Sequence, residues 1–174
     1  LNYRRGWVAP LGAGKTLAGL LAMQLYDRGE AAVLASRYLH ETWKSQAAEW
    51  GVPEPLISTY ESCHKLPDSV KCLVIDEAVA YKSSEAQRTL KAQAVSARCE
   101  TVLGFTGIPT AGGGPADFRW LRVVEPGCLP GDLKAWQFKW GLDTKLQEVG
   151  PNKAYITTEW DTVGIAKFIA PYVN

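Results

Sequence analysis

The segment from Ala9 to Thr16 has the residue types and spacing of a phosphate-binding loop. It reads Ala-Pro-Leu-Gly-Ala-Gly-Lys-Thr and lies between a short apolar stretch and an amphipathic one. Glycines let the backbone curl so that N–H groups face phosphate oxygens, and a following helix N-terminus adds favourable partial charge. Such a loop brings a lysine ammonium to the β- and γ-phosphates and a threonine hydroxyl to Mg²⁺. The pattern predicts a nucleoside triphosphate site at Gly12, Ala13, Gly14, Lys15 and Thr16, with Thr16 as a metal ligand.

Two other interpretations of this loop can be weighed from the residues. A strand-to-helix turn can use glycines without binding any ligand, and this alternative stays open. A dinucleotide-binding turn is excluded, because its third glycine would fall at Leu17.

Two adjacent carboxylates, Asp76 and Glu77, follow the apolar run Leu73-Val74-Ile75, 61 residues after Lys15. An aspartate at the end of a buried strand can hold Mg²⁺ opposite a phosphate-binding loop. The glutamate beside it can orient or deprotonate a water that attacks the γ-phosphate. Acids at the start of a helix are common on their own, but here they accompany the loop. We therefore expect Lys15, Asp76 and Glu77 to be catalytic, with Asp76 also binding the metal.

The segments that must position these residues alternate between strand-like and helix-like patterns. Strands are expected at 6–9, 31–35, 56–59, 72–75 and 101–105, and helices at 15–28, 38–50 and 84–98. After a glycine-rich break at 112–115, helices are expected at 117–124, 133–140 and 163–172, and a strand at 154–158. Apolar strands that alternate with helices are typical of a parallel sheet covered on both faces. The predicted class is a three-layer α/β fold with a mostly parallel central sheet.

The periodicity also predicts which side chains are buried. The apolar face of the first helix is expected to be Leu17, Leu20, Leu21 and Leu25, and that of 84–98 to be Ala86, Leu90, Ala94 and Ala97. Trp43 and Trp50 are expected to pack in the core. Four widely spaced cysteines favour reduced, buried thiols over a disulfide or zinc framework; they are Cys63, Cys72, Cys99 and Cys128.

Length and charge limit the remaining possibilities. The 174 residues, 47% of them hydrophobic, fit one domain with a sizeable core. The chain has 19 basic and 18 acidic residues, a net charge of +1, which excludes a polybasic arm or an acidic tail. The apolar run 17–23 is too short to cross a bilayer, so no membrane partner is expected. The expected location is the cytoplasm of a bacterial or phage-infected cell, or the nucleus of a eukaryotic one.

Several segments match one known family when they are taken in order. Asp76-Glu77-Ala78-Val79 resembles a DEAH box with valine in place of histidine. The segments 34–43, 57–62 and 105–110 are similar to a strand-loop-helix unit carrying Trp, a Thr-Tyr-Glu motif and a Leu-Thr-Gly-Thr-Pro motif. Together they make the chain resemble the Swi/Snf-type branch of superfamily-two DNA translocases and helicases. The resemblance is firm over about 6–129 and looser over 130–174.

The resemblance implies that 1–174 is a single RecA-like ATP-binding lobe, with its core at 6–129 and an extension at 130–174. It implies ATP and Mg²⁺ as ligands, double-stranded DNA as a partner, and a second RecA-like lobe of the same parent chain that lies outside this sequence. Little activity is expected from one lobe alone. It also implies nucleic-acid contact or coupling for Ser36, Arg37, Thr59, Tyr60, Thr106 and Gly107.

Other interpretations of these residues stay open at this point. Ser36 and Arg37 can equally cap a helix, and Tyr60 can equally pack in the core. A packaging-type ATPase lobe would use the same loop and acidic pair. A non-catalytic, nucleotide-sensing DNA-binding module is the other alternative, since Val79 and Ile108 depart from the family pattern.

Overall fold

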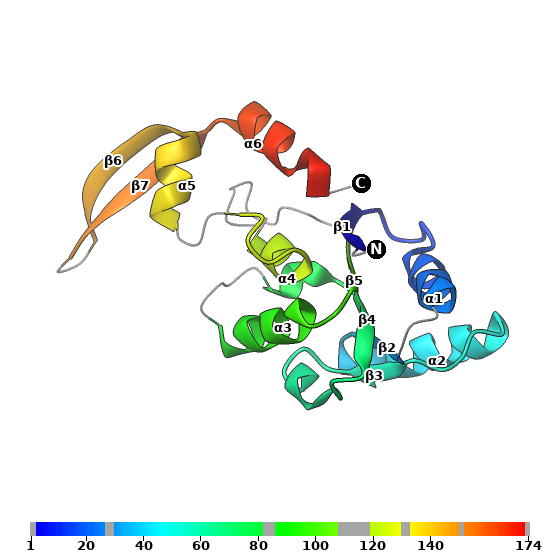
Figure 1. Cartoon of the computed structure of the whole chain (residues 1–174). Helices are drawn as coiled ribbons and strands as arrows, with labels where there is room; N and C mark the ends of the chain where they lie inside the picture. Colours follow the sequence, from blue (N-terminus) through cyan, green and yellow to red (C-terminus); the bar gives the residue numbers. More distant parts are fainter. Residues whose placement is uncertain are drawn as a thin grey trace.

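The computed structural model describes residues 3–26, 30–81, 86–107, 119–129, 133–149 and 152–172. Within this part of the chain, five strands form one parallel sheet in the order β1-β5-β4-β2-β3. These strands are β1 (Tyr3–Val8), β2 (Glu30–Leu34), β3 (Leu56–Ser58), β4 (Val70–Ile75) and β5 (Thr101–Thr106). The helices that accompany them are α1 (Lys15–Leu25), α2 (His40–Glu49), α3 (Gln87–Ala97) and the short α4 (Leu121–Val124). Figure 1 shows α1 and α2 on one face of the sheet and α3 and α4 on the other.

The central strands contribute alternate side chains to two apolar cores. In β4, Cys72 and Val74 join the core beneath α1 and α2, whereas Leu73 and Ile75 join the core beneath α3 and α4. Successive side chains of a strand point to opposite faces, so a strand buried on both faces must be apolar throughout. The predicted three-layer α/β class is confirmed.

Helix α1 buries only part of the leucine face that its periodicity predicted, because Leu20 is fully buried as predicted but other leucines are exposed. Leu21 is 44% exposed and Leu25 is 84% exposed. The buried residues of α1 are Gly19, Leu20 and Met23. A methyl group added at Gly19 would lie 2.9 Å from Cη2 of Trp43, so the glycine is what lets α1 approach the indole so closely. The small residue, and not the leucine stripe, sets the rotation of the helix.

Helix α3 also departs from the predicted face, since Leu90 is 45% exposed. Its buried residues are Thr89, Ala92, Val95 and Ser96. Ser96 can be buried because the Arg4 guanidinium donates hydrogen bonds to its hydroxyl, at 3.1 Å, and to its carbonyl oxygen, at 2.9 Å. A polar side chain therefore occupies the inner face of α3, and the apolar pattern alone does not reveal it.

The expectations for tryptophan and cysteine have mixed outcomes. Trp43 is 1% exposed, as predicted, but Trp50 is 53% exposed, so its predicted burial is wrong. Trp50 is the first residue after the end of α2, where the chain has already left the buried face. The four cysteines are all buried and free, as predicted.

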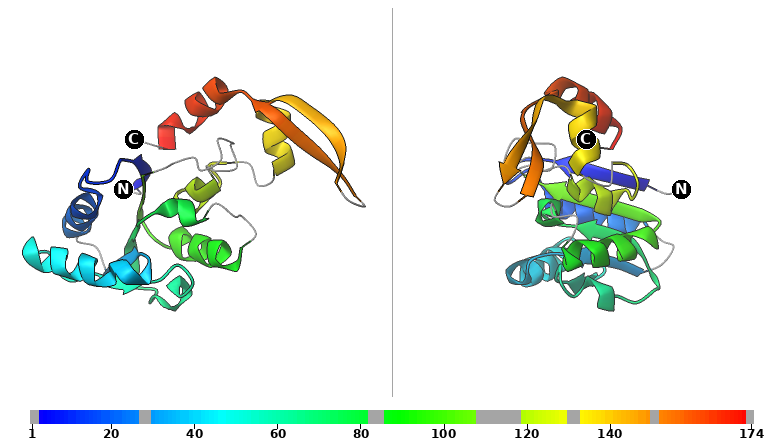
Figure 2. Two further views of the ribbon diagram at one scale, coloured as in Figure 1. Left: turned by 180° about the vertical axis from the view of Figure 1, so that it is seen from behind. Right: turned by 90° about the vertical axis from the view of Figure 1, so that its left-hand side faces the viewer.

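The C-terminal part forms a helical and hairpin extension beside the sheet. It consists of α5 (Leu133–Trp140), the antiparallel strands β6 (Gly141–Val149) and β7 (Asn152–Trp160), α6 (Thr162–Ile169) and a short 3₁₀ turn at Ala170–Tyr172. Figure 2 shows the hairpin projecting away from the parallel sheet. Trp140 and Ile165 are buried in the core beneath α3 and α4, which ties the extension to the sheet.

The sequence predicted parts of this extension. The predicted helix at 133–140 matches α5, the predicted strand at 154–158 lies within β7, and 163–172 lies within α6 and the turn after it. Strand β6 was not predicted, because its polar residues interrupt any two-residue alternation. Of the predicted helix at 117–124, only 121–124 is α-helical in the described part, and the break at 112–115 lies outside it. Among the described residues, no helix has the length and apolar character needed to span a bilayer.

Candidate functional site

The predicted site residues all lie at or after the carboxyl ends of the five parallel strands. Parallel strands end at one common edge of a sheet, so segments far apart in the sequence meet there. The strand ends at this edge are Val8, Leu34, Ser58, Ile75 and Thr106. These ends and the segments that follow them contain, in chain order, the glycine-rich loop, Ser36 with Arg37, Thr59 with Tyr60, Asp76 with Glu77, and Thr106 with Gly107.

The glycine-rich loop has the backbone shape of an anion cradle. Gly12 and Gly14 have φ angles of 80° and 77°, in the left-handed region that side chains disfavour. Gly14 caps α1, and the first turn of that helix carries no acidic side chain. The positive end of the helix dipole and its free N–H groups are therefore available to an anion.

The ammonium of Lys15 lies over its own loop. Its Nζ donates hydrogen bonds to the carbonyl oxygens of Ala9, at 3.0 Å, and of Pro10, at 3.1 Å. A methyl group added at Gly107 would lie 3.8 Å from this Nζ and 3.9 Å from Oε1 of Glu77. The segments that follow β1, β4 and β5 thus bring a lysine ammonium, a carboxylate and a glycine backbone close together.

The two carboxylates of the acidic pair have different hydrogen-bond donors. Asp76 is 8% exposed, and its Oδ2 accepts a hydrogen bond from the indole Nε1 of Trp43 at 3.1 Å. Glu77 has a φ of 47°, a left-handed conformation that is uncommon for a residue with a side chain. Its Oε2 accepts a hydrogen bond from Oγ1 of Thr106 at 3.4 Å. The sharp turn at Glu77 therefore brings its carboxylate toward β5 and the loop.

A cleft of about 730 Å³ joins the loop to the acidic pair. The loop side of its lining is formed by Leu11, Gly12, Gly14, Lys15, Thr16 and Leu17, and Asp76 and Glu77 lie beside them. The rest of the lining comes from residues that the sequence did not predict for the site: Tyr38, Leu39, Gln46, Glu49 and Trp50. Gln46, Glu49 and Trp50 have i, i+3, i+4 spacing, the pattern of one helix face. That spacing was visible in the sequence, but nothing in it indicated that this face meets the loop.

The structure separates the predicted nucleic-acid residues into exposed and buried ones. Arg37 is exposed, and Ser36 and Thr59 are half-buried. Tyr60 is 8% exposed, and its hydroxyl donates a hydrogen bond to the main-chain oxygen of Asp76 at 2.9 Å. Burial raises the pKa of Tyr60 from 10.0 to about 12. The side chain of Tyr60 is therefore packed behind the acidic pair, as the alternative interpretation held, and not on an outer face.

Two departures from the family pattern have different outcomes. Val79 is partly buried against the core beneath α3 and α4, so its apolar side chain has a packing role where the family has histidine. Ile108 lies outside the described residues.

The donor set of the cleft fits Mg²⁺ bound together with a nucleotide. Thr16 and Asp76 both line the cleft, and both offer oxygen ligands. Mg²⁺ in nucleotide sites typically takes one or two protein oxygens and completes its shell with phosphate oxygens and waters. Among the described residues, no three His, Cys, Asp or Glu side chains form a cluster that would hold a metal by itself. A metal site that depends on the nucleotide is the arrangement that these residues permit.

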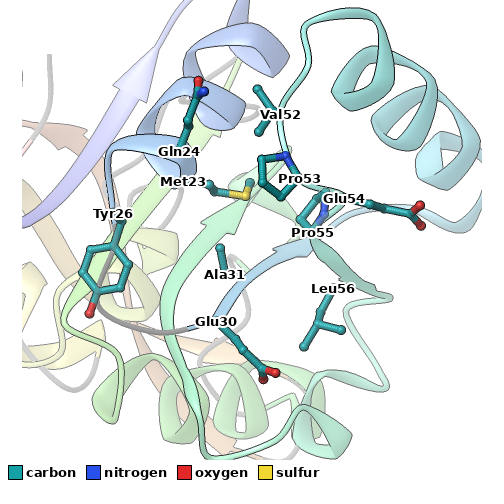
Figure 3. A pocket seen from close by; sticks show the side chains of 10 residues that line it. All are labelled: Met23, Gln24, Tyr26, Glu30, Ala31, Val52, Pro53, Glu54, Pro55 and Leu56. Atoms are coloured by element: carbon teal, nitrogen blue, oxygen red, sulfur yellow. The ribbon is translucent and has the colours of Figure 1, made fainter.

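A second, smaller hollow of about 360 Å³ lies at the opposite, amino edge of the sheet. Figure 3 shows its lining, which comes from the end of α1, the start of β2 and the segment that leads into β3. Its residues include Met23, Glu30, Val52, Glu54 and Pro55. None of the predicted site residues contributes to it.

Comparisons with known proteins identify the fold. No protein-family model matches the sequence, and no curated protein matches it. Among solved structures, the chain is similar to the SWI2/SNF2 ATPase core of Sulfolobus solfataricus in complex with dsDNA, with a TM-score of 0.70 and 14% identity over 99% of this chain. It is also similar to the Hef helicase domain of Pyrococcus furiosus, with a TM-score of 0.54 and 16% identity over 71% of this chain.

These likenesses concern part of each neighbour. The chain spans 40% of the Sulfolobus structure and 33% of the Pyrococcus one. At such low identity the similarity shows the fold alone, which this chain shares with part of an ATPase core and part of a helicase domain. The resemblance predicted from the motifs is therefore confirmed at the level of the fold.

Proposed function

We propose that this chain is the ATP-binding motor lobe of an ATP-dependent DNA helicase or translocase of the Swi/Snf type. One observation carries the proposal: Lys15, Glu77 and Gly107, from the segments that follow three different strands, meet beside the glycine-rich loop. A plain strand-to-helix turn would have no need of a carboxylate and a lysine converging on it. The fold shared with helicase-type ATPases supports the same function.

Each residue of the cleft has a role in this proposal. The loop N–H groups of Gly12, Ala13 and Gly14 bind phosphate oxygens, for which the Ala13 N–H exchanges its present acceptor, Pro10 O at 3.3 Å, for phosphate. Lys15 neutralises charge on the β- and γ-phosphates. Thr16 and Asp76 hold Mg²⁺, which when bound neutralises phosphate charge. Glu77 orients the attacking water and accepts its proton.

Thr106 and Gly107 connect the acidic pair to β5. The Thr106 hydroxyl hydrogen-bonds the Glu77 carboxylate, so a shift of this strand end would move the proposed base. Residues at the same edge, Ser36, Arg37 and Thr59, are the proposed contacts to a DNA backbone. Hydrolysis and DNA contact would then share one edge of one sheet, which is a short route for coupling them.

The proposed partners are double-stranded DNA and a second RecA-like lobe of the same parent chain. The Sulfolobus neighbour is a complex with dsDNA, and this chain spans 40% of it. The cleft is walled on one side by exposed side chains such as Trp50, and a second lobe would close it. Little hydrolysis is therefore expected from this lobe alone.

Nucleotide binding by calorimetry tests the proposal directly. The chain should bind Mg-ATP, and Lys15→Ala should weaken binding by about tenfold or more, because a charge-assisted contact to phosphate is lost. The matched control is Lys44→Ala, since Lys44 pairs with Glu41 at 2.9 Å and does not line the cleft. Equal heats in Lys15→Ala and the unmodified chain, at saturating Mg²⁺, would remove the phosphate-loop assignment.

Turnover separates a motor from a non-catalytic nucleotide sensor. In a protein that contains both lobes, double-stranded DNA should stimulate phosphate release, and Glu77→Gln should abolish the stimulation. Nucleotide binding without any turnover would favour the non-catalytic module instead. Unchanged turnover in Glu77→Gln would show that Glu77 is not the base.

A further inference from the structure

Trp43 connects three elements that meet behind the nucleotide cleft. It lies on α2, is 1% exposed, and belongs to the core formed with α1 and the central strands. Its ring lies against Gly19 of α1, where an added methyl group would come within 2.9 Å of Cη2. Its Nε1 donates a hydrogen bond to Oδ2 of Asp76, which follows β4. One rigid side chain thus joins the loop helix, α2 and the proposed metal ligand.

The hydrogen bond fixes one oxygen of a carboxylate whose backbone is also held. The main-chain N–H of Asp76 donates to Leu34 O at 2.9 Å, and its carbonyl accepts from the Tyr60 hydroxyl at 2.9 Å. Rotation of the carboxylate about its terminal torsion remains soft, since such sp³–sp² torsions have broad minima. The indole N–H restrains that rotation by engaging Oδ2. Among the described residues, no donor reaches Oδ1, which leaves that oxygen for another ligand.

A hydrogen bond from a neutral donor suits this position electrostatically. Asp76 is 8% exposed, so its charge has lost most of its water, and a buried carboxylate needs donors. A lysine or arginine there would satisfy the charge but would compete with Mg²⁺ for it. The indole supplies a donor without a positive charge, so it does not compete with the metal.

We propose that Trp43 is a positioning residue for Mg²⁺: its indole N–H holds Oδ2 of Asp76, so that Oδ1 faces the metal in the nucleotide complex. The proposal rests on the proposed function of the cleft. It assigns to a core tryptophan a role in metal affinity, in addition to packing. It makes Mg²⁺ dependence, and not nucleotide affinity in general, the property that Trp43 controls.

The chain offers a matched control in Trp7. Trp7 packs against the same core, with its ring 6.0 Å from that of Phe105. Its buried Nε1 has no hydrogen-bond partner among the described residues. Trp43→Phe and Trp7→Phe therefore make the same replacement in the same core, and only the first removes a hydrogen bond to Asp76.

The experiment compares binding of a non-hydrolysable ATP analogue with Mg²⁺ and with EDTA, by calorimetry on the 174-residue chain. In Trp43→Phe, the apparent Mg²⁺ affinity in the complex should fall about tenfold while binding in EDTA changes less than about twofold, the size typical of a lost outer-shell partner. Trp7→Phe should keep the unmodified Mg²⁺ dependence. The same Mg²⁺ dependence in Trp43→Phe and Trp7→Phe would overturn the proposal. No Mg²⁺-dependent binding in the unmodified chain would instead remove the proposed function.

A second measurement covers the case in which Trp43→Phe does not fold. Indole N–H resonances of the ¹⁵N-labelled chain, assigned sequentially, report each tryptophan separately. The Trp43 resonance should shift when Mg²⁺ is added to the nucleotide complex, and should shift in Asp76→Asn, whereas the Trp7 resonance should move little. Equal responses of the two resonances would contradict the proposal.

Discussion

The two edges of the sheet carry hollows of opposite character. The carboxyl edge has the larger cleft, lined by a glycine-rich loop, a lysine and two carboxylates. The amino edge has a smaller hollow, and its lining includes Met23, Val52, two prolines and the glutamates Glu30 and Glu54. Both hollows lie beside α1. They differ in lining because the carboxyl edge meets the N-terminal end of this helix and the amino edge meets its C-terminal end.

Chain direction explains why an anion would bind at only one edge. At the carboxyl edge a strand leads into a helix, so the N–H groups that begin α1 point into the cleft. At the amino edge a helix leads into a strand, so α1 ends there at Leu25 with its carbonyl groups. The helix dipole favours anions at the first end and disfavours them at the second. The two glutamates of the amino edge add to this repulsion.

Gly14→Ala is expected to have the largest effect on nucleotide affinity, and Gly51→Ala makes the same replacement at another glycine with a left-handed φ. Gly14 and Gly51 have φ angles of 77° and 63°, and neither has an atom within 4 Å of an added methyl group. In Gly14→Ala the loop should relax from its cradle shape, at a cost of about 1–2 kcal/mol to restore it. Nucleotide affinity, measured by calorimetry, should fall about tenfold, the equivalent of that cost.

Gly51→Ala is the control, because Gly51 has a left-handed φ like Gly14 but is not among the residues that line either hollow. It should lower the free energy of unfolding by about 1 kcal/mol through the same backbone strain, with no change in nucleotide affinity. Equal effects of the two variants on nucleotide affinity would show that the loss reflects general destabilisation and not the shape of the glycine-rich loop.

Charge reversal at one glutamate of each edge is expected to have a smaller effect. Glu49 lines the carboxyl-edge cleft and Glu54 lines the amino-edge hollow. Glu49→Lys should strengthen ATP binding about threefold to tenfold at low salt, because an exposed like charge near the triphosphate becomes an attractive one. Glu49 ends α2, so lysine there also suits the helix dipole.

Glu54→Lys changes the net charge by the same amount and should leave ATP affinity unchanged. Calorimetry at two salt concentrations checks both variants, and the gain in Glu49→Lys should disappear as salt rises. A gain of equal size in Glu54→Lys would mean that net charge, and not the edge, governs nucleotide binding.

The parts of the site that the sequence predicted are those whose chemistry is local. The glycine-rich loop is a contiguous run, and Asp76 and Glu77 are adjacent, so residue type and spacing suffice for them. Their convergence also follows from sequence, because an alternating pattern predicts parallel strands and these share a carboxyl edge. The proposed residue roles remain predictions that the variants above test.

The parts that escaped prediction depend on distances between segments. Trp43 and Asp76 are 33 positions apart, and an indole that hydrogen-bonds a carboxylate has the same sequence pattern as one that merely packs. The rotation of α1 depends on how closely Gly19 can approach that indole, and leucine periodicity carries no information on this. Trp50 was assigned to the core because helix spacing does not show where the last turn leaves the buried face.

The smallest expected effect concerns how the carboxyl edge holds its own acidic pair. Tyr60→Phe removes the hydroxyl that hydrogen-bonds Asp76 O and should lower the free energy of unfolding at pH 7 by about 1 kcal/mol. Burial raises the pKa of Tyr60 from 10.0 to about 12, so the folded state favours the neutral phenol. The neutral phenol therefore contributes fully to the free energy of unfolding below about pH 10, and this contribution is lost as pH rises toward 12. Chemical denaturation from pH 7 to 12 should therefore show that the free energy of unfolding falls less with pH in Tyr60→Phe than in the unmodified chain. Tyr38 is 79% exposed, so Tyr38→Phe should follow the unmodified chain. Parallel curves for Tyr60→Phe and the unmodified chain would show that this hydroxyl does not stabilise the carboxyl edge through its neutral form.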